Sequence, residues 1–220
     1  MGKITEKTRI NEGRGKGKYS KYKPWIKARE ISSEGTSSTF ADYKHGREIQ
    51  TLSQGELYYY YLLRWNDEVD DIREQYPMDL QTTIDIANMY GIKHPSCGKL
   101  TLTTDFLVFM TDGTKKAYSI KSSKKELSKI EIKDRILLEK TYWARQNVEF
   151  KVLFKSDVNV ILVQNIMDVT KCYYLSDVQT KEDMVRYKIA NKELKVDMDK
   201  DYLCYKKLVP LLKGCDDDED

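Results

Sequence analysis

Two strand-like segments joined by a four-residue turn constrain the fold of this 220-residue chain more than any other feature. Residues 100–110 are rich in Leu, Thr, Phe and Val, residues 115–121 form a second such segment, and Thr-Asp-Gly-Thr lies between them. An Asp-Gly pair in this position is a strong hairpin signal, because these residues tolerate the positive φ angles of a tight hairpin turn. The sequence therefore predicts two antiparallel strands joined at residues 111–114.

Helical and extended patterns surround this hairpin and indicate a mixed α/β fold. Residues 69–99 are read as extended and rich in turns, and no internal repeat interrupts the pattern. Since the pattern after residue 158 is helical throughout, we expect a small, mostly helical C-terminal part. Helices are predicted over residues 53–65, 124–147, 160–168, 181–191 and 202–212, and a further strand over 148–154.

The composition excludes whole classes of protein. Charged residues make up 33% of the chain, above the roughly 25% of an ordinary soluble domain. No apolar run reaches the roughly 18 residues that a membrane span needs, and the first residues carry no apolar segment of the signal-peptide kind. We therefore expect a cytoplasmic protein that makes no membrane contact.

The sequence offers few residues for catalysis by cysteine, by histidine or with a bound nucleotide. The four cysteines form no Cys-x-x-Cys pair, which argues against a disulfide framework and a zinc ribbon. The only two histidines are His45 and His94, and the glycine- and lysine-rich residues 13–18 lack the spacing of a phosphate-binding P-loop. Any chemistry must therefore use carboxylates and lysines, and any ATP would be bound by a partner.

The first thirty residues are strongly basic, with ten Lys and Arg side chains against three acidic ones. Together with Tyr19, Tyr22 and Trp25 they suit contacts to nucleic-acid phosphates and bases, although a solvated, flexible terminus is the alternative interpretation. The last five residues, 216–220, are all acidic and are expected to form a solubilising tail. The side chains predicted to contact DNA are Arg14, Lys16, Lys18 and Lys124.

The predicted hairpin carries an acid on one strand and a lysine on the next. Asp105 would lie at the same end of the sheet as Ser119 and Lys121, whose side chains share a face because side chains alternate along a strand. This is the spacing of PD-(D/E)xK nucleases, in which carboxylates hold Mg²⁺ and a lysine orients water or stabilises charge. The alternative is a solvated surface hairpin without chemistry.

Glu56 also has two interpretations. Ser53-x-x-Glu56 has the form of a capping box, in which the glutamate satisfies a backbone N–H at the start of a helix. It could instead be a metal ligand, and since a carboxylate has two oxygens, both roles can be filled together.

Several blocks of sequence occur in a fixed order between about residues 10 and 155 and cover most of the chain. They include Tyr22-x-Pro24-Trp25, Leu52-Ser53-x-x-Glu56-Leu57, Asp71-Ile72-Arg73-Glu74-Gln75-Tyr76-Pro77, Gly91-Ile92-Lys93-His94-Pro95 and Thr103-Thr104-Asp105-Phe106-Leu107-Val108. In this order they resemble the TnsA family, the endonuclease subunit of heteromeric transposases.

The resemblance implies a restriction-endonuclease-like, PD-(D/E)xK fold, with a mixed central sheet flanked by helices and a small helical C-terminal part. Its domains would be a catalytic domain with a basic arm over 1–168 and a partner-docking or reduced winged-helix domain over 169–215, before the acidic tail.

The resemblance also implies the active-site residues. Glu56, Asp105 and Lys121 take the places of the catalytic glutamate, aspartate and lysine, and Ser119 stands where the family has glutamine. Mg²⁺, for which Mn²⁺ substitutes, would be held by Glu56, Asp105, the Ile120 carbonyl and, with a poorer oxygen, Ser119. Glu126 or Glu131 is the alternative source of a further oxygen.

The implied function is hydrolysis of one strand, on the 5′ end side, at the double-stranded DNA ends of a transposon. A DDE transposase resembling TnsB would cut the other strand, and an AAA+ ATPase resembling TnsC would regulate the assembly. Two alternatives remain at this point. One is a catalytically inactive scaffold that bridges transposase, regulator and DNA, for which Ser119 is the support, and the other is a stand-alone phage or defence nuclease.

Overall fold

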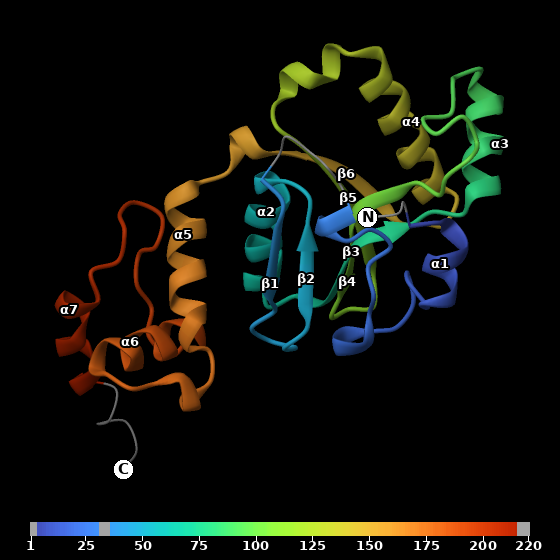
Figure 1. Ribbon diagram of the computed structural model, residues 1–220. Coiled ribbons are helices and arrows are strands. Elements are labelled where there is room, and N and C mark those ends of the chain that lie inside the picture. Colours follow the sequence, from blue (N-terminus) through green and yellow to red (C-terminus); the bar gives the residue numbers. More distant parts are fainter. Residues whose placement is uncertain (1–3, 31–35, 215–220) are drawn as a thin grey trace. The chain divides into compact units, whose positions relative to one another are not determined.

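The computed structural model describes residues 4–30 and 36–214 and divides into two compact units, Met1–Val158 and Asn159–Asp220. The first unit has the predicted mixed α/β architecture, and the second is helical (Figure 1). The two units divide between residues 158 and 159. The boundary predicted from the sequence, at 168–169, lies within the last turn of helix α5 (Val160–Val169). The predicted acidic tail, 216–220, lies outside the described residues.

A four-stranded mixed sheet in the order β3-β4-β5-β6 forms the centre of the first unit (Figure 1). The predicted hairpin is confirmed, because β4 and β5 pair antiparallel with Phe106 opposite Tyr118. Strand β3 is antiparallel to β4, and β6 is parallel to β5. The strands are β3 (Val69–Pro77), β4 (Thr103–Met110), β5 (Lys115–Lys121) and β6 (Glu149–Phe154).

The sheet separates two apolar cores, as strand alternation requires. Leu107 and Ala117 face one core with helices α3 (Leu80–Tyr90) and α4 (Ile130–Ala144). Phe106 and Tyr118, one residue away on the same strands, face the other core with helix α2 (Gln54–Trp65). A small antiparallel pair, β1 (Ser38–Ala41) and β2 (Glu48–Thr51), lies beside α2 (Figure 1).

Two expected elements differ from the structure. Residues 69–99 contain a nine-residue strand and an eleven-residue helix, α3, where we expected an extended, turn-rich stretch. The side chain of Asp79 caps α3 and Gly91, at φ 63°, ends it; tertiary packing overrides the low helix propensity of its Thr and Ile residues. The helix expected over 124–147 is interrupted at Lys129, between a short 3₁₀ helix and α4.

Part of the basic N-terminal segment is built into the first unit. A short helix, α1 (Glu6–Asn11), lies in this segment, and the Tyr22 and Trp25 side chains are buried. A Cβ added to Gly15, which has φ 74°, would lie 2.4 Å from the Pro77 Cγ. Glycine therefore lets the segments around residues 15 and 77 pack in close contact. The described residues 4–30 are not a simple flexible extension.

The second unit is a small helical cluster whose core is Val163, Ile166, Val169, Val185 and Ile189. Its helices are α5, α6 (Lys181–Ala190) and α7 (Tyr205–Leu208), and no strand occurs in residues 159–214. The Asn165 amide holds the loop between α6 and α7, because it donates to the carbonyls of Met198 and Asp201. The 3₁₀ helices of the two units are Tyr19–Lys21, Ala28–Glu30, Lys124–Ser128, Lys155–Asp157, Thr170–Cys172, Leu175–Asp177 and Val209–Gly214.

None of the helices in the described residues is long and apolar enough to cross a membrane.

Candidate active site

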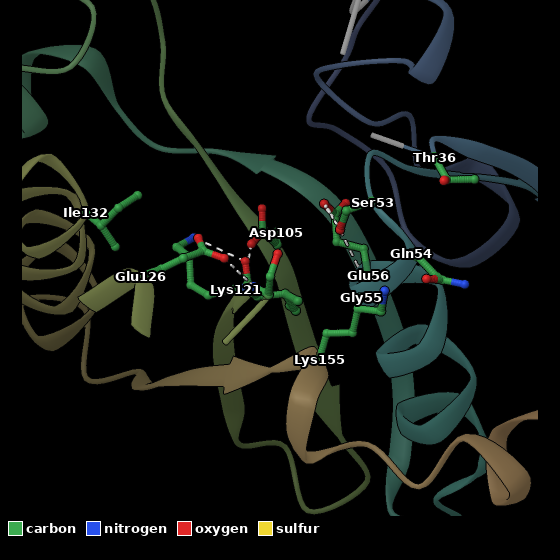
Figure 2. Close-up of a pocket in the computed structure, with 12 residues that line it drawn as sticks. Thr36, Ser53, Gln54, Gly55, Glu56, Asp105, Lys121, Glu126, Ile132 and Lys155 are labelled. Atoms are coloured by element: carbon green, nitrogen blue, oxygen red, sulfur yellow. Dashed lines mark hydrogen bonds between the residues drawn. The ribbon is translucent and has the colours of Figure 1, made fainter. Parts of the chain in front are cut away.

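A cavity of about 490 Å³ lies where the start of α2 meets the start of β4 and the end of β5. Figure 2 shows that Glu56 from α2 and Asp105 from β4 face this space from different elements, with Lys121 beside them. The other residues that line it are Thr36, Ser53, Gln54, Gly55, Ile120, Ser122, Glu126, Ile132 and Lys155. The structure thus brings together four of the residues predicted for the site, Glu56, Asp105, Ile120 and Lys121.

The Asp105 carboxylate binds the neighbouring strand where the regular pairing of β4 and β5 ends. The last residue pair between β4 and β5 is Phe106 with Tyr118, so the backbone beyond it needs other partners. The Asp105 Oδ2 accepts a hydrogen bond from the Ile120 N–H at 2.6 Å and lies 3.5 Å from the Ser119 Oγ. One carboxylate oxygen is thereby held, and the other has no protein partner among the described residues.

Glu56 is buried at the start of α2, and its carboxylate accepts hydrogen bonds from the residues that open this helix. The Ser53 Oγ accepts from the Glu56 N–H, as in a capping box, while the Glu56 Oε2 accepts from the backbone N–H of Leu52 at 2.9 Å rather than that of Ser53. Gln75 donates to the same oxygen at 3.1 Å, and the Ser53 Oγ donates to the Glu56 Oε1 at 3.0 Å. The carboxylate retains lone pairs for a further partner.

Glycine allows this helix start to approach the strand. A Cβ added to Gly55 would lie 2.9 Å from the Ile120 Cγ2 and 3.3 Å from the Lys155 Cβ. These separations are shorter than ordinary van der Waals contact, so a larger residue would push α2 away from β5. Gly55 is not among the residues predicted for the site, although a glycine in the first turn of a helix is itself a signal of a close approach.

The two carboxylates form a site that favours a cation. Burial raises the pKa of Glu56 to about 8, and the nearby charge of Asp105 acts in the same direction. Within the described chain, neither carboxylate has a cationic side chain at ion-pair distance. A bound cation would reverse this repulsion and hold both groups ionised.

The donor set fits a hydrated Mg²⁺ ion. Mg²⁺ is usually held by one or two carboxylates and keeps several waters for substrate phosphates to replace, and here Glu56, Asp105 and Ile120 line one cavity. Residues 4–30 and 36–214 contain no group of three or more His, Cys, Asp or Glu side chains placed to enclose a metal. A closed structural site of the zinc type is therefore not formed by these residues.

Ser119 is directed at Lys121 rather than into the cavity. It is only 1% exposed and does not line the cavity. The Lys121 ammonium donates to the Ser119 Oγ at 2.8 Å and to the Ile120 carbonyl at 3.2 Å. Of the two glutamates considered as sources of a further oxygen, Glu126 lines the cavity and Glu131 does not.

The four predicted DNA contacts fall into two groups. Arg14 is 3% exposed, and its guanidinium pairs with Glu30 at 2.6 Å and Glu12 at 2.7 Å. The structure therefore places Arg14 inside the first unit and not at a surface. Lys16, Lys18 and Lys124 are exposed, and Lys124 pairs with Asp157 at 3.2 Å.

The chain is similar in sequence to known proteins. Residues 66–155 match the family model described as "TnsA-like endonuclease N terminal", which includes Asp105 and Lys121. Over 167 residues the chain is 34% identical to the transposon Tn7 transposition protein TnsA of Escherichia coli. That alignment covers 72% of this chain and 59% of the relative, so the chain spans about three fifths of that protein's length.

Proposed function

The chain belongs to the TnsA family, and we propose that it is the metal-dependent endonuclease subunit of a heteromeric transposase. It would hydrolyse one strand of double-stranded DNA, on the 5′ end side, at each end of a transposon. The observation that carries this proposal is the meeting of Glu56, Asp105 and Lys121 at one cavity.

Glu56, Asp105 and the Ile120 carbonyl are the proposed holders of Mg²⁺. When bound there, Mg²⁺ supplies Lewis-acid polarisation of the phosphodiester and lowers the pKa of water. The Ile120 N–H fixes the Asp105 carboxylate, and the Leu52 N–H and Gln75 amide fix that of Glu56. These hydrogen bonds limit the orientations that each carboxylate adopts, which is the contribution of outer partners to a metal site.

Lys121 is proposed to stabilise negative charge on the phosphate and to orient the attacking water. Its ammonium is directed by the Ser119 Oγ and the Ile120 carbonyl, and it lines the same cavity as the carboxylates. A preorganised cation of this kind lowers the barrier because it needs no reorientation as charge develops. Ser119 would act through Lys121 in this proposal, instead of as a metal ligand.

We further propose that this subunit acts with two partner proteins. A DDE transposase resembling TnsB would cut the second strand, and an AAA+ ATPase resembling TnsC would regulate the assembly. We propose that the helical unit, 159–214, docks such a partner.

An inactive scaffold is the second candidate, and one observation favours it. The buried Ser119 does not offer an oxygen to the cavity, where the family has a glutamine. We favour the endonuclease because Lys121 and both carboxylates are retained in one place.

Removing divalent metal should abolish cleavage. With the partner transposase and ATPase present, EDTA should stop nicking of a transposon-end duplex, and Mg²⁺ or Mn²⁺ should restore it, because the two carboxylates need a cation to hold the phosphate. Nicking of the strand assigned to this subunit is followed on a denaturing gel. Nicking that continued in excess EDTA would contradict a metal-dependent site.

Salt dependence should separate the exposed lysines from the rest. The double variant Lys16→Gln/Lys18→Gln should weaken binding to transposon-end DNA and reduce the slope of log K against log[salt] by about 2, since each lost phosphate contact removes about one unit. Binding is measured by fluorescence anisotropy at several salt concentrations. Lys140→Gln, which changes an exposed lysine of α4, is the matched control; equal slopes for all three proteins would place the DNA elsewhere.

A further inference from the structure

Gln75 adopts a backbone conformation that few side chains tolerate. It lies in β3 with φ 47°, in the left-handed region, and is 2% exposed. Glycine, asparagine and aspartate are the residues usually found in this region. Where strained, buried residues of this kind persist, the surrounding structure holds them, and they are concentrated at functional sites.

The strained residue lies opposite a proposed metal ligand. On either side of it, Glu74 pairs with Phe106 and Tyr76 pairs with Thr104 of β4. Gln75 itself is left out of this register, at the position facing Asp105. A break in a ladder turns a side chain away from its regular direction, and such breaks are common beside active sites.

Both ends of the Gln75 amide are used. Its Nε2 donates to the Glu56 Oε2 at 3.1 Å, and its Oε1 accepts from the Thr103 Oγ1 at 2.9 Å. The Thr103 hydroxyl therefore fixes which end of the amide faces Glu56. The other donors to Glu56, Leu52 and Ser53, lie within four residues of it, so Gln75 is its hydrogen-bond link to the central sheet.

The N-terminal segment also holds the backbone at Gln75 in place. The Trp25 N–H donates to the Gln75 carbonyl at 3.2 Å, and the Tyr22 hydroxyl donates to the Glu74 carbonyl at 3.0 Å. Both aromatic side chains are buried. The main-chain turn at Gln75 is thus fixed independently of its amide, which leaves the amide free to direct Glu56.

We infer that Gln75 is a positioning residue, whose amide holds the buried Glu56 carboxylate in the orientation that faces Asp105 across the cavity. The inference rests on the proposed function, because it concerns the metal site of that function. Its contact is with the carboxylate of Glu56, so its effect on cleavage would be indirect, through metal affinity.

Two variants of Gln75 separate positioning from folding. Gln75→Asn keeps an amide and suits the positive φ, but it is one methylene shorter and no longer reaches Glu56. Gln75→Met keeps the side-chain length and removes the amide. Thr83→Val is the matched control, since it removes a buried hydroxyl on α3 that donates to the Leu80 carbonyl.

The measurement is Mn²⁺ binding by isothermal titration calorimetry, with circular dichroism and thermal unfolding to confirm that each variant is folded. We expect both Gln75 variants to bind Mn²⁺ roughly 10- to 100-fold more weakly and Thr83→Val to match the wild type. The Mg²⁺ concentration for half-maximal nicking, measured with the partner proteins, should rise by the same factor, and maximal nicking should be largely recovered at high Mg²⁺.

The outcomes distinguish this inference from the proposed function. If wild type binds Mn²⁺ and a folded Gln75→Asn protein binds it equally well, Gln75 does not position Glu56, and the endonuclease proposal stands. If the wild type binds no Mn²⁺ and Asp105→Asn changes nothing, both proposals fail together. Weaker binding that high Mg²⁺ does not relieve would also overturn the inference, since it would indicate a damaged site.

Discussion

Replacing Lys121 with methionine should reduce the rate of nicking roughly 10²- to 10³-fold, the usual effect of losing one preorganised charge-stabilising donor. The ammonium contacts no carboxylate and is directed instead by the Ser119 Oγ and the Ile120 carbonyl. Its loss should therefore leave Glu56 and Asp105 in place, and Mn²⁺ binding should be retained or slightly tightened because a nearby positive charge is removed.

Two measurements decide this prediction. Nicking is followed with saturating Mg²⁺ and the partner proteins, and Mn²⁺ binding is followed by calorimetry. Lys116→Met, on the same strand and outside the cavity lining, is the matched control and should behave as wild type. If Lys121→Met nicked at the wild-type rate, the lysine would have no part in the reaction; a loss of both nicking and Mn²⁺ binding would instead assign it to metal binding.

Replacing Arg14 with methionine should lower the free energy of unfolding by about 3 kcal/mol. Breaking a buried ion pair on one side costs about 3–5 kcal/mol because the remaining charge is left buried. The lower end applies here, since Arg9 still pairs with Glu30 at 3.2 Å after Arg14 is lost. The lost hydrogen bond to the Trp25 carbonyl adds to the cost, and that segment also contacts Gln75.

Urea unfolding followed by tryptophan fluorescence measures this change, and DNA binding at several salt concentrations measures the alternative role. Arg14→Met should keep the wild-type salt slope, whereas Lys18→Met should keep the wild-type stability, because Lys18 is exposed. A stable Arg14→Met protein with a reduced salt slope would return Arg14 to the DNA-contacting surface.

Local sequence signals were sufficient to predict the hairpin and to place its polar residues at one end of the sheet. The Asp-Gly turn and the alternation of side chains placed Asp105 and Lys121 at one end of the sheet, and both line the cavity. The capping pattern at Ser53 located the start of α2 and hence Glu56. That Glu56 and Asp105 face the same cavity depends on the long-range packing of α2, and only the family resemblance indicated it.

What sequence reasoning missed depends on contacts between distant segments. The basic composition of residues 1–30 indicated a nucleic-acid surface. It did not show that Arg14 would be buried in an ion pair with Glu30. The role of Gln75 depends on a backbone conformation and on Thr103, 28 residues away, neither of which has a local signal. The resemblance suggests Ser119 as a replaced metal ligand, because spacing cannot show that its hydroxyl is directed at Lys121.

Asp105 is proposed to belong to a nuclease site that cuts one strand of a transposon end. The most direct test labels each strand of a transposon-end duplex separately. Cleavage is then mapped with Mg²⁺, the partner transposase and ATPase, and either wild-type protein or Asp105→Asn. We predict that wild type nicks one strand at the transposon boundary, and that Asp105→Asn leaves that strand intact while the transposase still cuts the other. Identical products from the two proteins would contradict the account and favour the scaffold.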